Sequence, residues 1–127
     1  MRILLADDHS DIRSALRLLL EQDESSWQVI QEVENFPQLL QELDLLHPDL
    51  ILLDWELQGF GVGNRATARR PLPELFEKLK ATNPGLKILV LSGRLEAQAE
   101  ALAAGADAFV SKGEPPERLL EQLRQLS

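Results

Sequence analysis

Charged and hydroxyl side chains stand at the ends of four of the five short apolar segments in this sequence. Asp7 and Asp8 follow the first segment, and Asp54 comes at the end of the third. Ser92 directly follows the fourth segment, and Lys112 comes just after the fifth. Carboxylates can bind a divalent cation, and an ammonium group with a hydroxyl can stabilise a phosphoryl group in transfer. If one edge of the fold gathers these groups, the sequence predicts phosphoryl-transfer chemistry there.

The three carboxylates need a positive partner if they lie within a few ångströms of one another. Like charges at that distance repel strongly, and a cation among them relieves the repulsion. Mg²⁺ suits such a site, because it binds oxygen ligands and keeps positions for water or phosphate oxygens. A carboxylate between the cation and Lys112 could act as a nucleophile, as in aspartyl-phosphate chemistry. The residues therefore point to Mg²⁺ as the cofactor.

The apolar segments alternate with longer stretches in which apolar residues recur at helical spacing. The segments of strand length cover residues 3–6, 27–33, 50–53, 88–91 and 108–110. Five alternations of strand and helix predict an α/β fold, with a parallel sheet and five helices on its two faces. The second segment is mixed in polarity and the fifth is short, so both are expected at the edges. This favours a flavodoxin-like sheet of order 2-1-3-4-5, whose carboxyl edge would gather the chemical residues.

The fourth helix is expected to bury one apolar face against this sheet. Gly105 stands where a glycine commonly ends a helix. Four apolar residues before it follow helical spacing and would form the buried face: Leu95, Ala99, Leu102 and Ala103.

The composition narrows the class of protein. The chain has 127 residues, which is the size of one domain, and 44% of them are hydrophobic. It has no cysteine, which excludes disulfides, thiolate catalysis and cysteine metal ligands. With 21 acidic and 13 basic residues the net charge is -8, so we expect no direct binding to nucleic acid. No apolar run is long enough to cross a membrane, and acids come too early for a signal peptide, so we expect a cytoplasmic protein.

Taken together, these features resemble the receiver domain of two-component response regulators. The features are the Asp7-Asp8 pair, the His-Pro-Asp-Leu-Ile-Leu-Leu-Asp run ending at Asp54, Ser92, the Ala-Gly-Ala-Asp turn at 104–107, and Ser111-Lys112. The resemblance covers residues 1–126, and the chain looks most like receivers that usually carry a helix-turn-helix output domain. It implies that residues 1–127 form a single receiver domain, with no output domain in this chain.

The resemblance implies a role for the main candidate residues. Asp54 would be the phospho-acceptor, taking a phosphoryl group from the phosphohistidine of a histidine kinase or a phosphotransfer protein. Mg²⁺ would bind to Asp8, to Asp54 and to the backbone carbonyl of Glu56, with Asp7 as a direct or water-mediated ligand. Lys112 would pair with Asp54 and later with the phosphoryl group.

Ser92 and Phe109 would form the conformational switch of such a domain. Ser92 would hydrogen-bond to the phosphoryl group and move toward it, and the rotamer of Phe109 would follow. An ordinary core position explains Phe109 equally well. Glu56 and Arg94 would flank the phosphoryl group, where an ion pair between them could hinder the attacking water and prolong the phosphorylated state.

The resemblance also implies how the signal would leave the domain. Phosphorylation would shift the face of the fourth and fifth helices, which would control a partner or output domain, and the same region could form a homodimer. The chain would then be a signalling switch and not an enzyme, apart from catalysing its own phosphorylation and dephosphorylation. Two alternatives are a Mg²⁺-dependent phosphatase-like enzyme with an aspartate nucleophile, and a receiver-like interaction module that is never phosphorylated.

Residues 58–73 depart from the resemblance, because the stretch between Asp54 and Ser92 is longer than in most family members. This segment combines glycines, prolines and arginines, which predicts a surface loop. Our hypothesis is that the loop modulates access to Asp54; a nucleotide-binding loop is the less favoured alternative. The two histidines are expected in ordinary positions, since His9 begins a helix and His47 precedes a proline.

Overall fold

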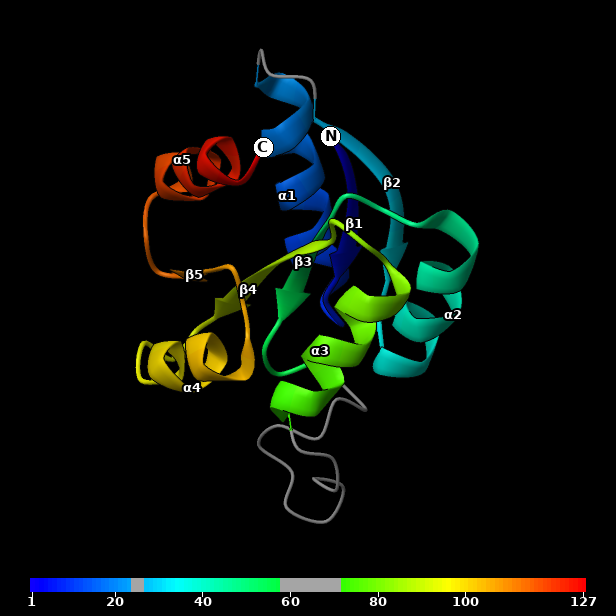
Figure 1. Cartoon of the computed structure of the whole chain (residues 1–127). Coiled ribbons are helices and arrows are strands. Elements are labelled where there is room, and N and C mark those ends of the chain that lie inside the picture. Colours follow the sequence, from blue (N-terminus) through cyan, green and yellow to red (C-terminus); the bar gives the residue numbers. More distant parts are fainter. Residues whose placement is uncertain (24–26, 58–71) are drawn as a thin grey trace.

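The described part of the chain, residues 1–23, 27–57 and 72–127, folds as five strands that alternate with five helices in this computed structural model. In chain order the elements are β1 (Arg2–Ala6), α1 (Ser10–Gln22), β2 (Gln28–Val33), α2 (Phe36–Leu46), β3 (Leu50–Asp54), α3 (Leu72–Thr82), β4 (Lys87–Ser92), α4 (Ala97–Ala104), β5 (Ala108–Ser111) and α5 (Pro116–Leu126). The strands pair in parallel in the order β2-β1-β3-β4-β5 (Figure 1). This confirms the predicted flavodoxin-like fold and its strand order.

The most apolar segment of the sequence forms the centre of the sheet. β3 is buried along its whole length and pairs with both β1 and β4, so that Ile51 aligns with Leu4 on one side and Ile88 on the other. β2, which mixes polar and apolar residues, lies at one edge, and the short β5 lies at the other. The most apolar strands lie inside the sheet and the less apolar ones at its edges, because an interior parallel strand is covered on both faces.

Helices cover both faces of the sheet, and each face has its own apolar core. α2, α3 and α4 pack on one face around Trp55 and Phe76, whose rings meet edge to face with their centroids 6.3 Å apart. α1 and α5 pack on the other face through Leu20, Leu119 and Leu123. Because successive strand residues point to opposite faces, the strands contribute to both cores. The two cores therefore hold the ends of the strands in fixed positions.

The prediction of which side of α4 is buried was wrong, because the opposite side of the helix faces the core. The buried residues are Ala97, Ala101 and Ala104, whereas Leu95 is 64% exposed and Leu102 is 43% exposed. Apolar residues occur on both sides of this helix, so hydrophobic spacing does not select one side. The alanines allow close packing on the aromatic core beneath. The α4 outer strip, as we name the apolar residues left exposed, consists of Leu95, Ala99, Leu102 and Ala103.

The loop expected at residues 58–73 can be compared with the structure only at its end. Residues 58–71 lie outside the described residues, and α3 begins at Leu72, so the last two positions belong to a helix. Among the helices that the structure describes, none is both long and apolar enough to cross a membrane.

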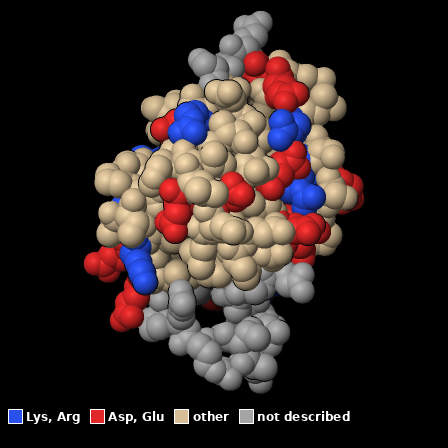
Figure 2. Space-filling view, turned by 90° about the vertical axis from the view of Figure 1, so that its right-hand side faces the viewer, with Lys and Arg blue, Asp and Glu red and all other residues tan. Residues whose placement is uncertain are grey.

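Acidic and basic side chains are interspersed on the face of the molecule that carries α2 and β2 (Figure 2). Nearby, Glu32 of β2 accepts hydrogen bonds from two arginines of α1, at 3.1 Å from Arg13 and 2.7 Å from Arg17. The pKa of Glu32 is lowered, because these guanidinium groups outweigh the opposing effect of its partial burial. The negative charge of Glu32 is therefore compensated by its two arginine neighbours.

Candidate functional site

The carboxyl ends of four neighbouring strands place the candidate residues at one edge of the sheet. Asp7 follows β1, Asp54 ends β3 and Ser92 ends β4. Lys112 follows β5, and its backbone N–H donates to the carbonyl of Ser92 at 2.8 Å, which continues the pairing of the two strands. As predicted, the parallel sheet brings together side chains from opposite ends of the sequence.

The ammonium group of Lys112 bridges two buried carboxylates. Its Nζ atom lies 3.2 Å from Asp7 Oδ2 and 3.2 Å from Asp54 Oδ1. The side chains of Asp7 and Asp54 are only 2% and 1% exposed. Burial by itself lowers the pKa of Lys112, but the charges of Asp54 and Asp7 together outweigh it and raise that pKa. Lys112 is therefore held in its charged form.

Asp54 carries more negative charge around it than this one lysine compensates. Burial raises the pKa of Asp54, the charge of Asp7 raises it further, and Lys112 only partly opposes both. Asp54 Oδ1 accepts hydrogen bonds from Lys112 and from the backbone N–H of Glu56 at 3.1 Å. Asp54 Oδ2 is buried and has no hydrogen-bond partner within the described residues. The protein that the structure describes thus leaves this oxygen without a hydrogen-bond donor.

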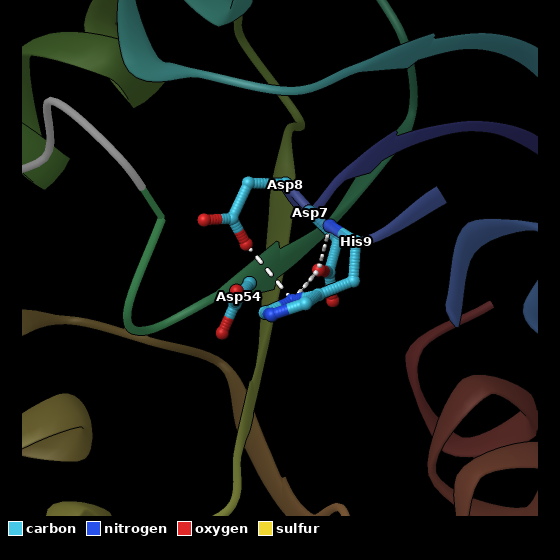
Figure 3. A group of neighbouring side chains, drawn as sticks. All are labelled: Asp7, Asp8, His9 and Asp54. Carbon is cyan, nitrogen blue, oxygen red and sulfur yellow. Dashed lines mark hydrogen bonds and ion pairs between the residues drawn. The ribbon is translucent and has the colours of Figure 1, made fainter. Parts of the chain in front are cut away.

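Four side chains converge beside this oxygen and form what we call the acidic pocket. Its members are Asp7, Asp8, His9 and Asp54, and one potential ligand atom from each lies within 4.8 Å of all the others (Figure 3). The donor set fits Mg²⁺, because three carboxylates converge there and the buried Asp54 Oδ2 lacks a donor from the described protein. Together with Lys112 and a neutral His9, the three carboxylates would leave an excess of two negative charges, which matches a divalent cation.

His9 belongs to this pocket, although the sequence analysis gave it no role. It does precede α1 as expected, but its Nδ1 atom lies 3.0 Å from Asp7 Oδ1 and 2.9 Å from Asp8 Oδ1. Its backbone N–H also donates to Asp7 Oδ1 at 2.9 Å. The hydrogen bond to Asp7, followed by the charge of Asp8, raises the pKa of His9. The signal in the sequence was the contiguous Asp-Asp-His triplet at the end of the first strand.

Ser92 is buried and is held by Glu56 in this structure. The Ser92 hydroxyl lies 3.0 Å from Glu56 Oε1 and 3.1 Å from Glu56 Oε2, and it accepts a hydrogen bond from the Arg94 backbone N–H at 3.0 Å. The predicted ion pair between Glu56 and Arg94 is loose, at 3.9 Å between charged atoms. The family resemblance implied that Glu56 and Arg94 are neighbours, but it did not reveal that the carboxylate of Glu56 binds Ser92.

Phe109 lies in β5 and is 6% exposed within the core that also contains Trp55 and Phe76. This position is the one that an ordinary core phenylalanine would have. Its role as a rotameric switch stays a prediction.

Comparison with known proteins agrees with this geometry. The family model of the response regulator receiver domain matches residues 3–124. The nitrate/nitrite response regulator NarL of Escherichia coli is 32% identical over 126 residues, which cover 97% of this chain and 53% of NarL. The phosphate regulon regulator PhoB of the same species is 29% identical, and the aligned part covers 97% of this chain and 50% of PhoB. The chain thus spans about half the length of these relatives.

A solved structure supports the same assignment. The isolated receiver of RcsB from Salmonella enterica serovar Typhimurium, determined with the phosphomimetic BeF₃⁻, superposes with a TM-score of 0.79 at 26% identity, over 99% of this chain and 87% of that one. The family model, moreover, matches almost the whole chain. The protein therefore belongs to the response regulator receiver domain family, whose members act as phosphorylation-dependent signalling switches.

Proposed function

We propose that the chain is a phospho-accepting signalling switch in which Asp54 takes a phosphoryl group from the phosphohistidine of a histidine kinase or phosphotransfer protein. The observation that carries this proposal is the state of Asp54: one oxygen is fixed by Lys112 and the Glu56 amide, while Oδ2 is buried beside the acidic pocket. Attack by this oxygen would form a P–O bond as the P–N bond of phosphohistidine breaks, and the neutral imidazole would leave.

The neighbours of Asp54 would divide the work of this transfer. Asp7, Asp8 and Asp54, with the backbone carbonyl of Glu56, would hold Mg²⁺, which supplies positive charge to the phosphoryl oxygens when it is bound. Lys112 already orients Asp54 Oδ1. After transfer it would contact the negatively charged phosphoryl group while still paired with Asp7. Fixed charges of this kind stabilise a transition state without having to reorganise during the reaction.

Ser92 would report the phosphorylated state to the surface of the domain. Its hydroxyl has one proton and donates it to Glu56, so a bond to the phosphoryl group requires that Ser92 leave Glu56. Movement of Ser92, with Phe109 following, would change the region of α4 and α5. Glu56 and Arg94, released from Ser92, could then hinder the water that hydrolyses the acyl phosphate.

The α4 outer strip supports a role for this region in binding a partner. Leu95 and Leu102 are large apolar side chains exposed to solvent; Leu102 lies in α4, which contacts β5, and Leu95 comes just before this helix. The proposal includes a homodimer, or contact with an output domain, through the α4 and α5 region. It also includes a cytoplasmic location, where a histidine kinase would supply the phosphoryl group.

The proposal is tested by incubating the protein with Mg²⁺ and acetyl phosphate or phosphoramidate and then measuring its intact mass. We expect a single phosphate adduct in the wild type and in Asp44→Asn, an exposed acid on α2, and none in Asp54→Asn. Multiple turnovers of a small phosphate ester would instead indicate a phosphatase-like enzyme. Absence of any adduct in the folded wild type would indicate a receiver-like interaction module, and either result would overturn the proposal.

A further inference from the structure

We propose that His9 makes the acidic pocket a site for a divalent transition-metal ion such as Mn²⁺ or Co²⁺, with the His9 Nδ1 atom as a ligand beside the carboxylates. This inference rests on the proposed function only in that it uses the same metal pocket. It assigns to this chain an additional nitrogen ligand and a preference among cations, neither of which phosphorylation of Asp54 requires.

The spacing of His9 from the carboxylates of Asp7 and Asp8 fits octahedral coordination. Two ligand atoms at right angles, each about 2.1 Å from a metal ion, lie about 3.0 Å apart. His9 Nδ1 lies 3.0 Å from Asp7 Oδ1 and 2.9 Å from Asp8 Oδ1. The largest separation in the group is 4.8 Å, somewhat above the roughly 4.2 Å between ligands on opposite sides of an ion. A small inward movement of the side chains would therefore complete a common coordination sphere.

A second observation, independent of the histidine, points to a cation at the same place. Asp54 Oδ2 is buried, and within the described residues it has no hydrogen-bond donor. A buried carboxylate oxygen without a donor is costly, and a metal ion would satisfy it. Lys112 is already paired with Asp7 Oδ2 and Asp54 Oδ1, whereas one oxygen of Asp7 and one of Asp8 point toward the ring of His9 (Figure 3).

The chemistry of the imidazole determines which cation gains from His9. Mg²⁺ prefers oxygen ligands and keeps several waters, so replacing a water with imidazole adds little for this ion. Imidazole suits first-row transition metals, whose affinity for nitrogen-containing sites rises from Mn²⁺ through Co²⁺ to Ni²⁺. The His9 side chain is 59% exposed, so its ring can adjust to an ion without disturbing the core. The pocket should thus discriminate in favour of these ions.

Electron spin-echo modulation of protein-bound Mn²⁺ tests the ligand directly, since it detects a coordinated ¹⁴N nucleus. We expect nitrogen coupling in the wild type, its loss in His9→Ala, and its retention in His47→Asn. His47 is the other histidine of the chain, at the C-terminal end of α2 with a positive φ of 47°, which asparagine tolerates. His9→Gln keeps a polar side chain and should also abolish the coupling, which guards against misfolding of the alanine variant.

Calorimetric titration with Co²⁺ and with Mg²⁺ supplies the second measurement. We expect Co²⁺ to bind the wild type more tightly than Mg²⁺, and His9→Ala to weaken Co²⁺ binding about tenfold or more. Its effect on Mg²⁺ should be below about threefold. Binding of Mn²⁺ without nitrogen coupling, or equal Co²⁺ affinity in wild type and His9→Ala, would overturn this inference and leave Mg²⁺-dependent phosphorylation of Asp54 intact. Absence of all metal binding would overturn both.

Discussion

The two halves of the site are held in different ways. On one side, Lys112 joins Asp7 and Asp54 at 3.2 Å each, and both carboxylates are almost fully buried. On the other side, Glu56 binds Ser92 through a hydrogen bond, while its ion pair with Arg94 reaches 3.9 Å between partly exposed side chains. Buried charge networks are costly to disturb, whereas loose and exposed ones are not. The first half is therefore suited to chemistry and the second to switching.

Removal of Lys112 should have the largest effect, because it breaks the tightly held half. Lys112→Ala would leave two buried carboxylates without their ammonium partner, which we expect to lower the free energy of unfolding by about 3 kcal/mol. Loss of the positive charge should also slow phosphorylation by acetyl phosphate about a hundredfold. Urea denaturation and intact-mass kinetics measure the two effects.

The matched control for that experiment is Lys80→Ala. Lys80 pairs with Asp107 at 2.8 Å, but both side chains of this pair are partly exposed. Its loss should change the free energy of unfolding by less than about 1 kcal/mol and leave the phosphorylation rate unchanged. Equal destabilisation by the two alanine variants would remove the distinction between the two halves of the site.

A smaller effect is expected in the loosely held half. Glu56→Ala removes the acid beside the phosphoryl group that would hinder the attacking water, so dephosphorylation should become about two- to tenfold faster, the scale of one charge-assisted hydrogen bond. Decay of the phosphate adduct after removal of the donor measures this rate. Arg94→Ala separates two explanations: it should act like Glu56→Ala if the ion pair with Arg94 hinders the water, and only weakly if Glu56 hinders the water by itself. No change in Glu56→Ala would reject the role of Glu56 altogether.

The carboxyl ends of the strands were the most predictable part of the site. Asp7, Asp54, Ser92 and Lys112 follow apolar segments, and a parallel sheet necessarily brings such ends together. The ring of His9 and the bond from Ser92 to Glu56 depend on side-chain rotamers, which spacing alone does not determine. The buried side of α4 was predicted wrongly for a related reason, since alanines on one side and leucines on the other fit the same helical period.

The free energy of unfolding should depend modestly on pH through Asp54, in the buried half of the site. Burial, with the charge of Asp7, raises the pKa of Asp54 above its ordinary value. The folded chain thus keeps a proton on Asp54 at a pH where the unfolded chain has lost it. Its contribution to stability is therefore greatest below the ordinary aspartate pKa and is lost as the pH rises through the raised one.

Urea denaturation of wild type and Asp54→Asn over a range of pH measures this contribution. The free energy of unfolding of the wild type should fall relative to the variant by at most about 1.4 kcal/mol per pH unit within that window. Parallel curves for the two proteins would contradict the raised pKa of Asp54.

The smallest effect is expected on the α4 outer strip. Leu102→Ser replaces an exposed side chain and should change the free energy of unfolding by less than about 0.5 kcal/mol. The adjacent Ala101 is buried, so Ala101→Leu should cost about 1–3 kcal/mol through overpacking. Thermal or urea unfolding of the two variants checks the orientation of α4, and the opposite ranking would show that the helix buries the other side.

The central claim, that Asp54 is the phospho-acceptor, is tested most directly by locating the phosphate within the chain. Borohydride reduces an acyl phosphate on aspartate to homoserine, which changes the mass of the peptide that contains it. After incubation with Mg²⁺ and acetyl phosphate, we predict homoserine at position 54 and no reduction at Asp7 or Asp8. Reduction at Asp7 or Asp8, or no reduction at any of the three residues, would contradict this claim.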